Sequence, residues 1–271
     1  MRYRKGMVDI SEERDIPALK LVRDARAISL SQATSELILA NVEVHPNSTR
    51  WRFNRLSKVG LIERLSHEQA IGEPVYVITQ VGLAFLESKG HAILALGSTT
   101  KTILQPAEVF HMLELNAIRI ALKQASLLEH WKNELQIVSE NLVNFGSTTK
   151  DYDAIVTLNL EGRKVRFALE YERTAKSTAR YRDIVRAIEG DSAIDFVLYL
   201  VANQELLFLL NQELRRIGAK IAIGLASLFK AQLLETRVLF MAGQDTDYRP
   251  LVELLTDLPE VIGEESALFA S

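Results

Sequence analysis

The spacing of apolar residues at the start of the chain predicts three helices. Apolar side chains recur every three or four positions, as on one face of an α-helix, in the segments 16–25, 30–39 and 51–59. Ser29 or Ser31 is expected to cap the second helix, and Ser48 or Thr49 the third. Gly60 is expected to end the third helix, because glycine readily adopts the left-handed backbone that follows many helices.

Two short β-patterns and a fourth helix follow. Residues 61–65 and 75–78 are rich in aliphatic side chains and flank a turn at residues 72–74, which predicts a hairpin. A further helix is expected from Thr79, as its cap, to Gly90. Three helices, a hairpin and a helix, in this order, resemble the winged helix-turn-helix pattern of many bacterial regulators.

The rest of the chain changes between helical and strand periodicity. A polar, threonine-rich segment at 97–105 is expected to link a winged-helix domain of residues 1–97 to a second domain of residues 106–271. A long helix is expected over residues 107–131. It is followed by predicted helices at 175–190 and 204–217 and predicted strands at 135–139, 152–160, 164–171, 195–201, 220–223 and 237–241. The predicted fold class is therefore α+β.

Composition excludes several classes of protein. The 271 residues are 48% hydrophobic and 25% charged, as in a soluble globular protein. The chain has no cysteine, so neither a disulfide framework nor a thiolate zinc site is possible, and its five histidines lie too far apart for a histidine-rich metal site. The N-terminus shows no signal-peptide pattern and no segment has the length of a bilayer span, so a cytoplasmic protein without a membrane partner is expected.

The charge distribution favours a local nucleic-acid contact. The net charge is −3, but residues 1–100 hold 13 Lys and Arg against 11 Asp and Glu. The segment 44–62 contains no acidic residue and four basic ones, namely Arg50, Arg52, Arg55 and Lys58. These four are the candidate contacts to double-stranded DNA, on a helix whose Trp51, Leu56 and Val59 are expected to face the core. The alternative is a helical cap whose arginines are simply solvated.

Carboxylates on two predicted strands indicate a possible metal site. A helix, three strands, a helix and a strand form the core order of the PD-(D/E)XK nuclease-like fold. Alternation along the third strand places Glu170 and Glu172 on one face, and Asp153 lies near the start of the antiparallel strand before it. Asp153 and Glu170 are the candidate ligands for Mg²⁺ or Mn²⁺.

Glu172 stands where a nuclease of this type has a lysine that orients and deprotonates the attacking water. Because glutamate cannot supply that positive charge, Arg173, Lys176 or Lys164 would have to replace it. Lys176 joins Asp153, Glu170 and Glu172 as a candidate catalytic residue. The alternative is a structural acidic cluster whose ionic partners are Arg173, Lys176, Arg180 and Arg182.

Two stretches of the chain resemble a known family. The sequences FHMLELNAIRIALKQA (110–125) and DYDAIVTLNLEGRKVRFALEYERTAKSTARYRDIVRAI (151–188) are similar to the replication-relaxation family of plasmid and mobile-element proteins. Residues 170–174 fit the family's Glu-x-Asp/Glu-Arg-Thr motif, and Tyr152-Asp153 stands where the family tends to have Pro-Asp. The resemblance implies a winged helix joined to a nuclease-like domain, and a role in DNA replication, relaxation or transfer, or in regulating such genes.

Two functions follow as hypotheses. The first is a DNA-binding regulator or accessory factor with a degenerate nuclease-like domain. The second is a metal-dependent DNA endonuclease that the winged helix directs to its target. A homodimer is expected in either case, because a single recognition helix buries little surface and paired half-sites raise affinity.

Overall fold

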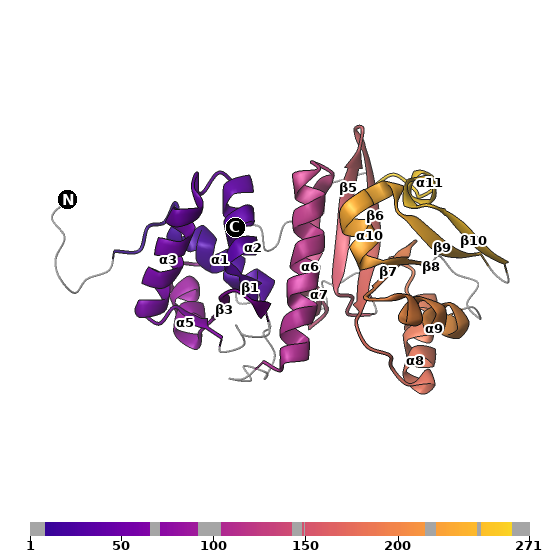
Figure 1. Cartoon of the computed structure of the whole chain (residues 1–271), viewed down its shortest axis with the longest axis horizontal. Coiled ribbons are helices and arrows are strands. Elements are labelled where there is room, and N and C mark those ends of the chain that lie inside the picture. The colour runs from indigo at the N-terminus through magenta and orange to yellow at the C-terminus, as the bar shows by residue number, and fades with distance from the viewer. Residues whose placement is uncertain are drawn as a thin grey trace. The chain divides into compact units, whose positions relative to one another are not determined.

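The computed structural model describes residues 9–65, 71–91, 104–142, 148, 150–214, 221–242 and 245–261. Most of the predicted linker at 97–105 and the end of the predicted helix 204–217 lie outside these residues. The chain divides into an N-terminal unit, Met1–Asn116, and a C-terminal unit, Ala117–Ala270. Helices and strands occur in both units (Figure 1), so the expectation of an α+β protein is confirmed.

The N-terminal unit contains a cluster of helices and a small antiparallel sheet. The strands lie in the order β1-β3-β2. The elements are α1 (Asp15–Ala25), β1 (Ile28–Ser29), α2 (Leu30–Leu39), α3 (Pro46–Lys58), β2 (Ile62–Arg64), β3 (Val75–Ile78), α5 (Gln80–Ser88) and the first part of α6 (Pro106–Gln124), which crosses the unit boundary.

Local signals explain where these helices begin. Ser29 forms a capping box with Gln32, and the hydroxyl of Thr79 accepts a hydrogen bond from the Gly82 amide, so both expected caps are confirmed. The expected cap of α3 is wrong. The cap is His45, three residues before Ser48, and the helix begins at Pro46, because proline at the first helical position has its φ angle already fixed for a helix.

The core of the N-terminal unit is built around α1, α2 and α3. Phe53 and Leu56 of α3 are fully buried, and the ring of Phe53 meets that of Tyr76 edge to face at 4.9 Å between centroids. Trp51 was expected in this core, but 58% of it is exposed. Its neighbours Arg52 and Phe53 take the inward positions, which turns Trp51 away by the geometry of the helix.

The C-terminal unit is built on a seven-stranded sheet in the order β10-β9-β8-β7-β6-β5-β4. Strands β6, β7 and β8 are parallel, and the other neighbours are antiparallel. The strands are β4 (Leu128–Asn133), β5 (Ala154–Leu160), β6 (Arg163–Glu172), β7 (Val197–Val201), β8 (Ile221–Leu225), β9 (Arg237–Ala242) and β10 (Asp245–Pro250). The helices are α7 (Glu134–Leu142), α8 (Thr178–Glu189), α9 (Gln204–Leu214), α10 (Ala226–Gln232) and α11 (Leu251–Thr256), with a 3-10 turn at Leu233–Glu235.

The prediction was wrong between residues 124 and 142. The helix expected to reach residue 131 ends at Gln124, because Ser126 adopts a left-handed backbone at φ +59° and the chain turns into β4. The expected strand at 135–139 is part of α7. Asn133 and Gln136 start this helix, since the side chain of each accepts a hydrogen bond from the backbone amide of the other.

One face of the large sheet positions the acidic residues. Ala168, Val197 and Ile221 belong to a buried cluster that also contains apolar residues of α7, α8 and α9. Since side chains alternate along a strand, Glu170 and Glu172 lie on the same helix-covered face of β6 as Ala168. Both carboxylates are therefore buried at the carboxyl end of a central strand.

Candidate nucleic-acid interface and acidic site

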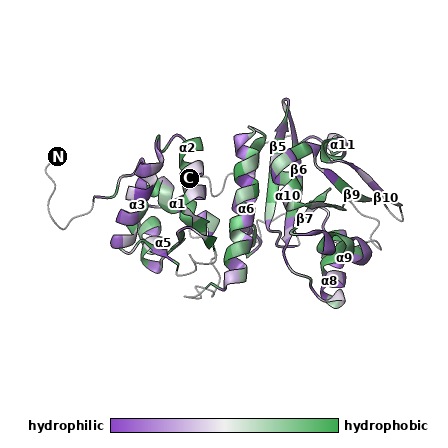
Figure 2. Ribbon diagram, viewed as in Figure 1, coloured by the Kyte–Doolittle hydropathy of each residue, from purple (hydrophilic) through white to green (hydrophobic). Residues whose placement is uncertain are grey.

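Helix α3 presents a polar face to solvent. After Pro46, which is also exposed, five exposed residues are spaced three, four, seven and eleven positions from the first of them: Asn47, Arg50, Trp51, Asn54 and Lys58. This spacing places them on one stripe, which we call the α3 face. No hydrogen bond or ion pair joins the side chains of Arg50, Asn54 and Lys58 to another described residue. Figure 2 shows α3 as mostly hydrophilic.

Arg52 points into the N-terminal unit instead. It is 5% exposed, its guanidinium donates a 2.6 Å hydrogen bond to Glu43 Oε1, and it also pairs with Asp15. Glu43 and Asp15 are themselves buried, so the three side chains form an internal charge cluster. The expectation that Arg52 contacts DNA is corrected by this burial, because its hydrogen-bonding groups are already engaged inside the unit.

Arg55 is half-buried and holds α3 to the beginning of the chain. Its guanidinium pairs with Asp15, donates a 2.9 Å hydrogen bond to the carbonyl of Asp9 and lies 5.1 Å from the centre of the Trp51 ring. Arg55 therefore contacts the Trp51 ring through its cation. The sequence predicted that the Arg55 side chain would project outward, and it does so only in part.

The charge of Asp15 is stabilised by this cluster. Burial alone would raise the pKa of Asp15, but hydrogen bonds from Arg55, the Ser11 amide and Arg52 outweigh burial and leave that pKa below its ordinary value. Asp15 thus remains ionised and joins α1 to α3.

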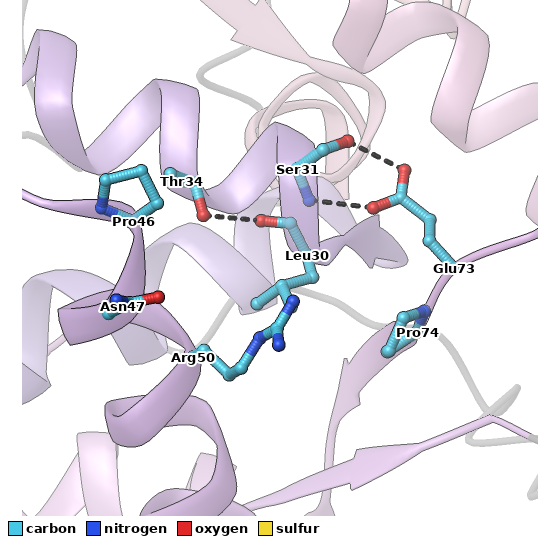
Figure 3. A pocket seen from close by; sticks show the side chains of 8 residues that line it. All are labelled: Leu30, Ser31, Thr34, Pro46, Asn47, Arg50, Glu73 and Pro74. Atoms are coloured by element: carbon cyan, nitrogen blue, oxygen red, sulfur yellow. Dashed lines mark hydrogen bonds between the residues drawn. The ribbon is translucent and has the colours of Figure 1, made fainter.

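A pocket of about 310 Å³ adjoins the α3 face at its N-terminal end (Figure 3). Arg50 and Asn47 line it from α3, and Ser31 and Thr34 from α2. Glu73 closes another side, where its carboxylate accepts hydrogen bonds of 2.9 Å from the Ser31 amide and 2.7 Å from the Ser31 hydroxyl. The α2 N-terminus is therefore already occupied by a carboxylate, and Arg50 is the cationic group that lines the pocket.

In the C-terminal unit, Asp153 comes close to Glu170. Ala154 pairs with Leu169 across β5 and β6, so Asp153 lies one step beyond, at the level of Glu170. Its Oδ2 accepts a 2.7 Å hydrogen bond from the Tyr171 amide. Burial, and then the negative charge of Asp153, raise the pKa of Glu170 to about 7, although the nearby lysines oppose the rise.

Two lysines form ion pairs with the two carboxylates of β6, Glu170 and Glu172. Lys150, from the segment before β5, pairs with Glu170 and lies 4.4 Å from the centre of the Tyr152 ring. Lys176 pairs with Glu172. Lys164 is at the far end of β6, where it pairs with Glu129, so it is not part of the site. The sequence pattern singled out Lys176 but missed Lys150, since Lys150 is separated from Glu170 by 20 positions and lies outside any strand.

The other cationic candidates lie on the surface. Arg173, Arg180 and Arg182 are exposed, whereas Glu172 is 4% exposed and paired with Lys176. The site therefore consists of Asp153, Glu170, Glu172, Lys150 and Lys176.

Three buried tyrosines surround this cluster. The hydroxyl of Tyr152 donates a 3.4 Å hydrogen bond to Asp191, and that of Tyr181 accepts a 3.0 Å bond from the Lys176 amide. The Tyr199 hydroxyl is buried and makes no hydrogen bond within the described part of the chain. Such an unpaired group costs about 1–3 kcal/mol of stability. Burial, and then the charges of Glu170 and Glu172, hold the pKa of Tyr199 well above its ordinary range.

The carboxylates provide limited ligation for a cation. Across the described ranges, no group of three or more His, Asp or Glu side chains is arranged to hold a metal ion. A divalent cation at Asp153 and Glu170 would therefore need water or backbone oxygens for its remaining ligands, as Mg²⁺ commonly does.

No helix in the described ranges is both long and apolar enough to cross a membrane.

Comparison with protein-family models, with curated proteins and with solved structures finds no match for this chain. The function of the protein is therefore inferred from the geometry of the two sites.

Proposed function

We propose that the protein binds double-stranded DNA through the α3 face and acts as a regulator or accessory factor in the replication, relaxation or transfer of a plasmid or mobile element. The observation that carries this proposal is the α3 face itself. Its arginine can pair with guanine, its asparagines with adenine, its lysine with phosphate, and Trp51 with the methyl group of thymine.

The order of elements in the N-terminal unit supports a winged helix-turn-helix fold for this unit. Helices α1, α2 and α3 are followed by the β2–β3 hairpin, to which β1 adds a third strand, and then by α5. In such a domain the third helix enters the major groove, and α3 is the helix with the exposed polar stripe. A homodimer would double the number of these contacts on a two-fold symmetric site.

The order of elements in the C-terminal unit supports a PD-(D/E)XK nuclease-like fold for this unit. After α6 come β4, β5 and β6, which are antiparallel neighbours, then α8, and then β7, which is parallel to β6. Helix α7 is an addition to that order. This topology and the motif at residues 170–174 support the resemblance to the replication-relaxation family.

DNA binding can be tested by fluorescence anisotropy with a labelled duplex that the unmodified protein has selected from a pool of random sequences. We expect the double substitution Arg50→Ala/Asn54→Ala to weaken binding at least tenfold, since each base contact contributes about 1–3 kcal/mol. The matched control Arg14→Ala/Lys89→Ala also changes two exposed polar residues of this unit and should bind as the unmodified chain does. Equal loss in both variants would argue against the α3 face.

The second candidate function is metal-dependent cleavage of DNA, and Lys150 is the observation that favours it. Glu172 occupies the position on β6 where a lysine was expected, but Lys150 brings a positive charge to Glu170 from a different segment. Asp153 and Glu170 would hold the cation, and the unpaired Tyr199 hydroxyl beside them fits a bound oxygen ligand. A cation bound there supplies Lewis acidity to a phosphoryl oxygen and lowers the pKa of a bound water.

Within this site the chain's own residues have separate tasks. Lys150 and Lys176 would counter the negative charge that gathers on the phosphate, while the Tyr171 amide orients Asp153. Supercoiled plasmid incubated with Mg²⁺ or Mn²⁺ tests this candidate. Nicking that disappears in Asp153→Asn/Glu170→Gln supports cleavage, and intact plasmid together with retained DNA binding supports the accessory role alone.

A further inference from the structure

The Tyr199 hydroxyl lies in the acidic site although Tyr199 comes from a different strand. The parallel pairing of β6 and β7 places Tyr199 beside Glu170. Tyr199 shares the helix-covered cluster with Ala168 and Val201, so its side chain projects from the same face of the sheet as Glu170. Only 1% of the residue is exposed. The hydroxyl is thus held where Glu170, Glu172 and Asp153 all influence it.

Its lack of a partner sets Tyr199 apart from the other two tyrosines. Tyr152 and Tyr181 are as deeply buried as Tyr199, but each has a hydrogen-bond partner, in Asp191 and the Lys176 amide. Within the described residues, the Tyr199 hydroxyl has none. A phenylalanine would fill the same space without burying an unpaired polar group. The hydroxyl therefore indicates that a ligand binds to it in the functional protein.

The neighbours of the hydroxyl identify the class of ligand. Oxygen atoms of Asp153 and Glu170 are hard ligands of the kind that divalent cations prefer. Because no third carboxylate or histidine in the described part of the chain completes the set, most ligands of such a cation would be water molecules. Water held in a buried site needs hydrogen-bond partners of its own, and the Tyr199 hydroxyl is suited to that task.

We propose that Tyr199 is a positioning residue of a divalent-cation site, and that its hydroxyl hydrogen-bonds to a water molecule on a cation held by Asp153 and Glu170. This inference rests on the cation site of the second candidate function and extends that site to β7. It also explains why a polar atom is kept unpaired inside the free protein.

The test compares cation binding with stability in the full-length chain. Mn²⁺ is titrated into the unmodified protein and into Tyr199→Phe, Tyr181→Phe and Glu170→Gln, with bound Mn²⁺ followed by electron paramagnetic resonance. We expect Tyr199→Phe to weaken Mn²⁺ binding about two- to tenfold, the effect of one hydrogen bond, and Glu170→Gln to abolish it. Without Mn²⁺, Tyr199→Phe should melt at or above the temperature of the unmodified protein, whereas Tyr181→Phe, which loses a paired hydroxyl, should melt lower.

The outcomes separate this inference from the cleavage function. Mn²⁺ binding that is unchanged in Tyr199→Phe, or absent in the unmodified protein, overturns the inference, as does a melting temperature that falls as far as in Tyr181→Phe. Plasmid nicking with unchanged Mn²⁺ binding in Tyr199→Phe would leave cleavage standing and remove Tyr199 from the site. Weakened binding in that variant without any nicking would retain the cation site and remove the cleavage function.

Discussion

Arginines on the same helix have different roles because their surroundings differ. Arg50 is exposed on the α3 face, whereas Arg52 is engaged by Glu43 and Asp15 inside the unit. A buried charge that loses its partner is costly, while an exposed charge contributes little to stability. Net charge along a helix therefore indicates that DNA binding is possible, but only burial shows which cations are available for it.

This difference gives a stability prediction. Arg52→Met removes the cationic partner of two buried carboxylates, so we expect the free energy of unfolding to fall by about 3–5 kcal/mol in urea titrations. Arg50→Met should change it by less than about 0.5 kcal/mol, because Arg50 is exposed. Similar losses in the two variants would contradict the assignment of Arg52 to the interior.

The acidic site predicts a dependence of stability on pH. Burial and Asp153 raise the folded-state pKa of Glu170 from an ordinary value of 4.5 to about 7. Since the folded state holds this proton more tightly than the unfolded state, Glu170 favours folding below pH 4.5, and its contribution is lost as the pH rises to about 7.

The variant Glu170→Gln tests the direction of this change in stability with pH. It carries no titrating carboxyl group at this position, so its stability should fall less between pH 4.5 and 7.5 than that of the unmodified protein in thermal melts. A steeper fall in the variant would show that Glu170 is fully ionised throughout this range.

At the scale of elements, helix caps and apolar periodicity were sufficient to predict most of the helices and strands. Helices α1, α2 and α5 and strands β5, β6 and β7 lie close to their expected positions, since each has either a regular apolar pattern or a capping residue. The apolar pattern predicted a strand in place of α7, because a short apolar run fits a strand as well as a helix. Strand β10 was missed because its residues, from Asp245 to Pro250, are mainly polar.

The same limit applies to the candidate sites. Alternation along β6 was enough to place Glu170 and Glu172 on one face. Lys150 and Tyr199 could not be found in this way, because one comes from an irregular segment and the other depends on the register of β6 against β7. Contacts between distant segments need the sheet order, which a single sequence does not determine.

The contact between α5 and Leu61, the residue before β2, provides a test of packing. A Cβ atom on Gly82 would lie 2.1 Å from the carbonyl oxygen of Leu61, which is backbone and cannot turn aside. We expect Gly82→Ala to lower the free energy of unfolding by about 3 kcal/mol or more, through a forced shift of α5. Ser88→Ala, at the end of the same helix, should have a much smaller effect, and a tolerated Gly82→Ala would mean that α5 packs less closely than described.

At the scale of the whole molecule, the two units carry separate chemistry. The N-terminal unit offers exposed cations and amides on α3, and the C-terminal unit offers buried carboxylates that are paired with lysines. We infer that the first selects DNA and that the second modifies it or has lost that activity. The first of these assignments is the central one, because a regulator or accessory factor of the proposed kind must bind DNA through α3.

The salt dependence of DNA affinity tests this claim most directly. Each cation that contacts a phosphate makes the slope of log K against log salt concentration steeper by about 0.9. We predict that Arg50→Ala/Lys58→Ala makes the slope shallower by about 1–2, while Arg14→Ala/Lys89→Ala leaves it unchanged. If the α3 variant retains the affinity and the slope of the unmodified protein, the α3 face is not the DNA-binding surface.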